Sequence, residues 1–403
     1  MCFDIEKIKI ITKDIPFYTN YDWNNWDDIP VLEKSVVSQN FKSMLSDKKD
    51  VKLVLNRTSG SSGIVLTIPW LQNESLFAMK KIWDLRKKHG VNIGDQYITC
   101  HANYFLGERL LQNKIIVSKN CHSISKLYMQ ESDIAHYVKY IQELQPTWML
   151  LQPSVAYSIG HYIYNQKIDF PFLKLIELTG EFLTNNIYQS IKKYFGGVDI
   201  CNNYGMQEFY CIGYAESSDT PFKLLEDNVY VEILDNDGNP VQKGREGSIV
   251  VSGLINSYFP LIRYRTGDYG FLTEKDGELY LHLTQSRSND AFICNDKVYD
   301  ASLFFNLTEY LNTKKCNIQQ FQYSYFNNDL LCKFYSVGCN VSDTQIKTFI
   351  SDYFTNHHRI VFDSISIEWS GEFAIPTGNN KIKYFNNMNL KKCSFEAIEA
   401  TKN

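Results

Sequence analysis

This sequence lacks the cysteine patterns that mark zinc sites and disulfide frameworks. Its ten cysteines are scattered, and none forms a C-x-x-C pair. We therefore expect reduced thiols, as in a cytoplasmic protein. The dipeptides Cys100-His101 and Cys121-His122 leave a shared metal site open as an alternative, although ordinary packing is the preferred interpretation.

Long apolar runs and a strong excess of charge are also missing. No segment is apolar for long enough to span a membrane, and the N-terminus MCFDIEKIKIITKDIPFY has charges where a signal peptide is apolar. The net charge of −4 and the pI near 6.1 give no reason to expect nucleic acid or an anionic membrane as a partner.

The hydrophobic pattern alternates between helices and short strands. Helical spacing runs through residues 71–90 and 133–146, and a further helix is predicted over 343–357. Short apolar runs at 147–154 and 172–184 predict buried strands, and residues 228–254 contain two strand-like runs joined by a loop. This pattern predicts a mixed α/β fold with a β-rich section after about residue 228.

The composition, 44% hydrophobic and 21% charged, is typical of a globular protein. The length of 403 residues favours two domains. We expect a boundary near residues 286–290. The predicted domains are 1–286 and 287–403.

The stretch NRTSGSSGIV, residues 56–65, places small hydroxyl residues around two glycines directly after an apolar run. Such a loop can wrap an anion with backbone N–H groups and hydroxyls, and it can equally be an ordinary turn. No lysine follows Gly63, so the G-x-x-x-x-G-K-[ST] pattern of phosphate-loop kinases and ATPases is absent.

Four further motifs follow in order along the chain. They are NNYGMQEF at 202–209, PLIRYRTGDYG at 260–270, QSRSND at 285–290 and PTGNNKIKYF at 376–385. With the glycine-rich loop, this series resembles the adenylate-forming superfamily of acyl-CoA synthetases, peptide-synthetase adenylation domains and luciferases. The closest likeness is to the phenylacetate–CoA ligase and capsule-biosynthesis group, and it covers residues 15 to 385.

The resemblance implies a large N-terminal adenylation core, with sheets flanked by helices, and a small mobile α+β C-terminal domain that closes over it. It also implies that the β- and γ-phosphates of ATP are held by Thr58, Ser59, Gly60, Ser61, Ser62 and Gly63. The remaining nucleotide contacts that it implies are Gly180, Glu181, Asn203, Tyr204, Gly205, Met206, Gln207, Asp268 and Arg287.

Five positions, including Glu208 and Lys381, have distinct roles by the same resemblance. Tyr204 packs on adenine, Asp268 accepts both ribose hydroxyls, and Arg287 reaches the nucleotide. Glu208 binds Mg²⁺, for which a carboxylate is a suitable ligand. Lys381 is the mobile catalytic lysine that neutralises charge between the acid and the α-phosphate.

Four positions depart from the family pattern. Val65 and Leu66 stand where proline and lysine are common after the glycine loop, so the loop carries no cation. Gln207 replaces a frequent threonine, which removes a hydroxyl contact to phosphate. Asn289 occupies the hinge position, where aspartate or lysine is usual.

The implied reaction is the ATP-dependent activation of a carboxylic acid to acyl-AMP. The acyl group then passes to a thiol, either of coenzyme A or of the phosphopantetheine of a carrier protein, or to an amine. An aromatic-rich region, from about residue 152 to residue 210, would suit an aryl or small hydrophobic acid or an amino acid if its side chains line a pocket, although core packing is the preferred interpretation of these aromatics. A non-catalytic nucleotide-binding homologue is the main alternative.

Overall fold

The computed structural model describes residues 5–58, 65–101, 114–126, 128–181, 183–217, 220–235, 237–284, 291–294, 297–300, 302–336, 338–371 and 385–387. The described residues divide into two compact units, the first ending at Leu283 and the second beginning at Thr284. The assignment of separate roles to 1–286 and 287–403 stays a prediction.

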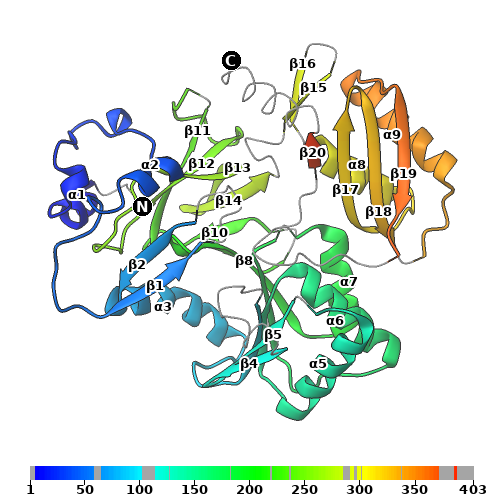
Figure 1. Cartoon of the computed structure of the whole chain (residues 1–403), viewed down its shortest axis with the longest axis horizontal. Helices are drawn as coiled ribbons and strands as arrows, with labels where there is room; N and C mark the ends of the chain where they lie inside the picture. Colours follow the sequence, from blue (N-terminus) through cyan, green and yellow to red (C-terminus); the bar gives the residue numbers. More distant parts are fainter. Residues whose placement is uncertain are drawn as a thin grey trace, which may run out of the picture. The chain divides into compact units, whose positions relative to one another are not determined.

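The first unit is built on a mixed sheet (Figure 1). Among the described residues it has twelve strands, in the order β11-β12-β13-β14-β10-β9-β8-β7-β6-β3-β5-β4. The strands are β3 (Tyr97–His101), β4 (Ile115–Ser118), β5 (Cys121–Ser125), β6 (Trp148–Leu151), β7 (Leu175–Thr179), β8 (Asp199–Met206), β9 (Tyr210–Ala215), β10 (Phe222–Leu224), β11 (Val229–Leu234), β12 (Gly247–Gly253), β13 (Tyr264–Lys275) and β14 (Glu278–Thr284).

Five neighbouring strands of this sheet, β5, β3, β6, β7 and β8, run parallel. Helix α3 (Gln72–Lys88) lies on one of their faces, and α5 (Glu131–Leu144), α6 (Pro153–Gln166) and α7 (Asn185–Phe195) lie on the other (Figure 1). Helices on both faces are what parallel strands require. The carboxyl ends of these strands meet at one edge, where α/β proteins bind ligands.

Local sequence signals explain the ends of these helices. The Thr184 hydroxyl accepts from the N–H of Ile187 and caps α7, and Pro153 occupies the first turn of α6. Helices α6 and α7 approach closely at Gly160, where a Cβ would stand 2.7 Å from the Phe195 ring. A larger residue at Gly160 would therefore separate the two helices.

The N-terminal segment packs on the antiparallel half of the sheet. It contains α1 (Ile5–Thr12), η1 (Pro16–Tyr18), η2 (Trp26–Asp28) and α2 (Lys34–Gln39). The buried Arg263 guanidinium donates to the carbonyls of Trp26 and Asp27 over 3.2 and 3.1 Å, and it lies 3.3 Å from Glu232. An arginine of the PLIRYRTGDYG motif thus fastens the N-terminal segment to the sheet.

Strands β1 (Leu53–Arg57) and β2 (Thr67–Leu71) form an antiparallel hairpin around the glycine-rich loop. The sequence pattern predicts that the helix over 71–90 directly follows this loop. Instead, β2 lies between the loop and α3, because residues 67–71 pair with β1 and place Ile68 and Trp70 in the core.

The second unit is a smaller α+β arrangement. Strands β19 (Ser364–Trp369), β18 (Asp329–Ser336), β17 (Ile318–Phe326) and β20 (Phe385–Asn387) form one sheet, and β15 (Ala291–Cys294) pairs with β16 (Lys297–Asp300). Helices α8 (Ser302–Thr313) and α9 (Asp343–His358) contribute Phe304 and Phe354 to its core, where the rings of Phe304 and Phe385 stack with centroids 4.8 Å apart.

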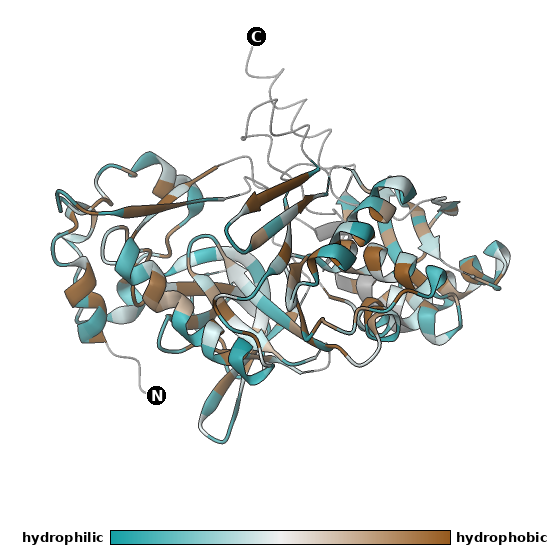
Figure 2. Cartoon of the chain, turned by 90° about the horizontal axis from the view of Figure 1, so that it is seen from below, coloured by the Kyte–Doolittle hydropathy of each residue, from teal (hydrophilic) through white to brown (hydrophobic). Residues whose placement is uncertain are grey.

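Hydropathy follows the same division between core and surface. In Figure 2 the hydrophobic colour concentrates in strands, while the helices carry both colours, as amphipathic helices do. No helix within the described ranges is long and apolar enough to cross a membrane.

Candidate functional site

Thr58 closes the base of the glycine-rich loop. Its N–H donates to the carbonyl of Leu66 over 2.9 Å, and its buried hydroxyl accepts from the N–H of Leu66 over 2.8 Å. The Nδ2 of Asn56 donates to the carbonyl of Gln207 over 3.2 Å, which joins this hairpin to the NNYGMQEF motif. The remaining predicted loop contacts lie outside the described residues: Ser59, Gly60, Ser61, Ser62 and Gly63.

The NNYGMQEF motif forms the end of β8 and the turn into β9. Gly205 lies at a β-bulge, where a Cβ would stand 2.6 Å from the carbonyl oxygen of Tyr210, so glycine is required there. Tyr204 is buried on β8, and Glu208 in the turn is 4% exposed. The same strand and turn hold the other predicted contacts, Asn203, Met206 and Gln207.

Two tyrosines hold the predicted functional carboxylates. The Tyr264 hydroxyl donates to Oε1 of Glu208 over 3.1 Å, and the Tyr204 hydroxyl donates to Oδ2 of Asp268 over 3.0 Å. Burial and the charge of Glu208 both raise the pKa of Tyr264, so this phenol remains a hydrogen-bond donor. The structure therefore connects the turn after β8 with β13 through two tyrosine–carboxylate pairs.

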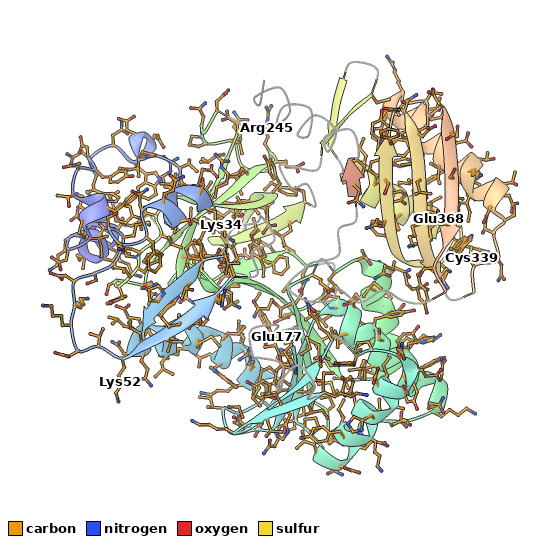
Figure 3. The ribbon with its side chains drawn as sticks, viewed as in Figure 1. Lys34, Lys52, Glu177, Arg245, Cys339 and Glu368 are labelled. Atoms are coloured by element: carbon orange, nitrogen blue, oxygen red, sulfur yellow. The ribbon has the colours of Figure 1, made fainter. Side chains whose placement is uncertain are left out.

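Lys34 brings a positive charge toward Glu208, and the sequence analysis did not identify it. Burial lowers the pKa of the Lys34 ammonium, and the charge of Glu208 opposes that shift. Figure 3 labels Lys34 at the start of α2. Within the part of the chain that the structure describes, its ammonium has no hydrogen-bond or ion-pair partner.

Long-range contacts with β13 fix the position of Lys34. The backbone N–H of Leu32 donates to the carbonyl of Arg263 over 2.8 Å, and the N–H of Arg265 donates to the carbonyl of Leu32 over 3.0 Å. The Nε of Arg265 donates to Glu33 over 2.7 Å. Because these contacts join residues far apart in the chain, no local sequence signal could have revealed them.

Glu208 fits a magnesium ion that is shared with a phosphate ligand. No group of three or more His, Cys, Asp or Glu side chains that could hold a metal occurs among the described residues. Mg²⁺ in phosphate-binding sites commonly uses one or two carboxylates and completes its shell with phosphates and water. A single buried carboxylate therefore fits a nucleotide-bound ion and does not fit a separate structural metal.

The histidines of the two Cys-His dipeptides have other partners. His101 Nδ1 lies 2.9 Å from the Ser123 hydroxyl, and His122 lies 2.6 Å from Tyr140 and 2.7 Å from Gln96. These bonds agree with the interpretation of ordinary packing.

The predicted residues Gly180 and Glu181 directly follow β7. Gly180 has a φ of +80°, which favours glycine. The Glu181 carboxylate accepts from the N–H and the hydroxyl of Ser154, over 3.0 and 2.9 Å, in the first turn of α6. Glu181 thus satisfies donors at a helix N-terminus while it fixes the backbone at this edge of the sheet.

A buried ion pair supports β8, the strand that carries Tyr204. Arg86 of α3 donates twice to Glu177 of β7, over 2.8 and 2.9 Å, and Asn203 Nδ2 donates to the same carboxylate over 2.9 Å. Glu177, labelled in Figure 3, is fully buried. The Arg86 guanidinium also lies over the rings of Trp83 and Trp148. This network connects the covering helix to the strand that carries Tyr204.

Two predicted charged residues cannot be placed. Arg287 and Lys381 lie outside the described residues. Their roles stay predictions.

Comparison with known proteins identifies the family. Residues 14–257 match the model of the family described as AMP-binding enzyme. The chain belongs to this family. The match includes the hairpin around the glycine-rich loop, Glu208 and the parallel half of the sheet, which confirms the resemblance found in the motifs.

Curated relatives of this chain include a phenylacetate-coenzyme A ligase of Pseudomonas putida. That protein is 32% identical over 138 residues, which are 32% of this chain and 31% of the relative. Protein CapK of Staphylococcus aureus is 23% identical over 253 residues, 60% of this chain and 53% of CapK. These matches cover about a third and about half of the relatives' own lengths.

Solved structures confirm the predicted fold class. A 2-hydroxyisobutyryl-CoA ligase complex superposes with a TM-score of 0.72 at 14% identity, covering 98% of this chain and 90% of that one. The amide bond synthetase McbA from Marinactinospora thermotolerans gives a TM-score of 0.55 at 16% identity, covering 85% and 69%. At these identities the likeness concerns the fold alone.

Proposed function

We propose that this AMP-binding protein is an ATP-dependent, AMP-forming carboxylate ligase. In the first half-reaction, a carboxylate oxygen of the acid attacks the α-phosphorus of ATP. The bond from that phosphorus to the bridging oxygen breaks, and pyrophosphate leaves with the negative charge. The observation that supports this proposal is the grouping of Glu208, its hydrogen-bond donor Tyr264, and Lys34, whose pKa burial lowers and the charge of Glu208 raises, at the turn next to the glycine-rich hairpin.

The geometry of β8 and β13 supports the proposed nucleotide contacts. Asp268 accepts the ribose hydroxyls with oxygens that can take several donors at once. Tyr204, which already binds Asp268, packs its ring against adenine, and Gly180 and Glu181 lie on the other side of the base. The Arg86–Glu177 ion pair between α3 and β7 helps to hold β8 in place.

Two groups of this chain handle the charge of the triphosphate. Glu208 holds Mg²⁺, which neutralises phosphate charge when bound. Lys34 supplies a cation that the glycine-rich loop itself lacks, since Val65 and Leu66 stand where a lysine is common. The Tyr264 hydroxyl orients the Glu208 carboxylate.

The last part of the chain completes the catalytic set in this proposal. The domain 287–403 carries Lys381, which approaches the α-phosphate during adenylation, and Arg287 reaches the nucleotide near the hinge. Rotation of this domain then separates Lys381 from the phosphate and admits the acyl acceptor.

A thiol is the proposed acceptor, either coenzyme A or a phosphopantetheine carrier. The relative from Pseudomonas putida is named a phenylacetate-coenzyme A ligase, which supports coenzyme A and an aryl acid as the first compounds to test. Transfer to an amine is the alternative outcome of the same test.

The experiment supplies the protein with ATP, Mg²⁺ and a panel of aryl, small hydrophobic and amino acids. Pyrophosphate release and mass detection of acyl-AMP report the first half-reaction, and added coenzyme A, carrier protein or amines identify the acceptor. We expect pyrophosphate release with at least one acid and a large loss in the Glu208→Gln variant. ATP binding without pyrophosphate release for any acid would contradict the proposal and indicate a non-catalytic nucleotide-binding homologue.

A further inference from the structure

The end of β5 carries a buried lysine that has no role in the nucleotide contacts proposed above. Lys126 directly follows this strand, and its N–H donates to the carbonyl of His101 over 2.9 Å. The residue is 8% exposed. Lysine is almost never buried to this extent unless its charge is paired.

Among the described residues, the Lys126 ammonium has one hydrogen-bond partner, and that partner is neutral. Its Nζ donates to Oε1 of Gln152 over 2.9 Å. Within the described ranges, no carboxylate lies within the 4.0 Å of an ion pair with Lys126. An ammonium has three N–H donors, so two donors and the charge itself are left for a ligand. Burying such a group without an anion is unfavourable.

Gln152 connects this lysine to the predicted adenylate site. It follows β6 directly, and its Nε2 would lie 3.6 Å from a Cβ placed on Gly180. The Cys100 thiol lies close to the same residues. Burial raises its pKa to about 11, and the charge of Glu181 also raises it. A backbone hydrogen bond with Gln152 and the charge of Lys126 lower it. These groups therefore gather at the carboxyl ends of neighbouring parallel strands.

The direction of the sheet indicates which end of the acid would meet Lys126. The reacting carboxylate must lie beside the nucleotide, near Tyr204 on β8. Strand β6, which leads into Gln152, is two strands away in the order β8-β7-β6, or about 10 Å along the edge. The far end of a bound acid that extends along this edge therefore reaches Gln152 and Lys126.

We propose that Lys126 and Gln152 bind a second carboxylate at the far end of the substrate, so that the enzyme activates dicarboxylic acids. The assignment of the reacting end rests on the proposed function. The second carboxylate accepts the two remaining N–H groups of Lys126 and one from the Gln152 amide, and it supplies the counter-charge that no described carboxylate provides within ion-pair distance. A monocarboxylic acid of the same shape would leave the ammonium facing apolar carbon.

The test compares matched acids that differ in one terminal carboxylate: phenylacetate with 4-carboxyphenylacetate, and octanoate with suberate. Pyrophosphate release gives kcat/KM for the wild-type protein and for Lys126→Met, Lys126→Arg and the control Lys139→Met, whose lysine is exposed on α5. Thermal melts show whether each variant folds. Calorimetric titration of each acid without ATP provides a readout that does not need turnover.

We expect the wild-type protein and Lys139→Met to prefer the dicarboxylates by about 10- to 100-fold. Lys126→Met should lose this preference and keep its activity with the monocarboxylates, while Lys126→Arg should retain part of the preference. If the wild-type protein prefers monocarboxylates to dicarboxylates, the inference is wrong and the proposed ligase activity stands. The same holds if a folded Lys126→Met loses kcat/KM equally for both acids of a pair. Tighter dicarboxylate binding with no pyrophosphate release would support the inference and overturn the proposed ligase activity. Failure to bind or activate any acid of the panel would overturn both.

Discussion

Replacing Asp268 with alanine should weaken ATP binding by about 5- to 150-fold. The ribose would lose an acceptor for its hydroxyls, and the loss of hydrogen bonds to a charged group corresponds to about 1–3 kcal/mol of binding free energy. The same carboxylate also accepts from the Tyr204 hydroxyl over 3.0 Å, so its removal leaves that buried tyrosine without this acceptor. Stability should therefore fall as well.

Tyr204→Phe is the matched control, because it removes the same internal hydrogen bond and leaves the carboxylate of Asp268 in place. We expect this variant to lose about 1 kcal/mol of unfolding free energy. Its ATP affinity should change less than that of Asp268→Ala, because the acceptor for the ribose remains and the phenyl ring still packs on adenine.

Isothermal titration with Mg-ATP measures the affinity, and denaturant unfolding with circular dichroism measures the stability. If Asp268→Ala is folded and binds ATP as tightly as the wild-type protein, the ribose assignment is wrong. If Tyr204→Phe loses as much affinity as Asp268→Ala, the tyrosine hydroxyl carries the effect and the carboxylate does not contact the ribose.

Three further predictions concern charged residues. Lys381→Ala should slow acyl-AMP formation by about a hundredfold or more, and much more than it slows thioester formation from preformed acyl-AMP. Single-turnover assays of the two half-reactions test this. If only Lys383→Ala loses adenylation, Lys383 is the catalytic lysine. Lys34→Met should slow pyrophosphate release. Because burial lowers the pKa of Lys34, the wild-type rate should fall at a pH below that at which an ordinary lysine loses its proton, and Lys34→Arg should remove this fall. Identical pH profiles for the wild-type protein and Lys34→Arg would contradict the role. Arg86→Met should cost about 3–5 kcal/mol of unfolding free energy, because it leaves the Glu177 carboxylate buried without its ion-pair partner. In denaturant titrations, the double variant Arg86→Met with Glu177→Met should be more stable than Arg86→Met and less stable than the wild-type protein.

Regular elements with a strong local pattern could be predicted from the sequence. The helices predicted over 133–146 and 343–357 are confirmed as α5 and α9, and the strand within 147–154 is confirmed as β6. The two strands within 228–254 are β11 and β12. The two helices show the helical spacing of apolar residues, while the strands read as short apolar runs that are buried almost continuously, so in both cases the information is local.

The β1–β2 hairpin shows where the local pattern was insufficient. The sequence 65–71 is short and reads as a continuation of the loop, and its strand character depends on pairing with residues 53–57. Its two inward side chains, Ile68 and Trp70, find their partners in a core formed from distant segments. Pairing between strands is a tertiary property, and a single sequence without homologues does not contain it explicitly.

Lys34 and Lys126 escaped the sequence analysis for a related reason. A lysine is usually solvated, so neither residue differs from the other lysines of the chain until its surroundings are known. Lys34 becomes distinctive because Leu32 is bound to β13, and Lys126 because it is buried against Gln152. Both observations depend on contacts between residues that are distant in the sequence.

The PLIRYRTGDYG motif shows that the contacts of a motif depend on residues far away in the sequence. Adjacent residues of a strand point to opposite faces, so Tyr264 reaches Glu208 while Arg265 turns away and binds Glu33. A reader of the sequence would assign a motif arginine to a phosphate, because arginine suits that task. In the structure Arg263 binds backbone carbonyls and Arg265 binds a carboxylate, and both hold the segment that leads into α2. Within the described residues, the positive charge next to Glu208 therefore comes from Lys34, which these arginines position.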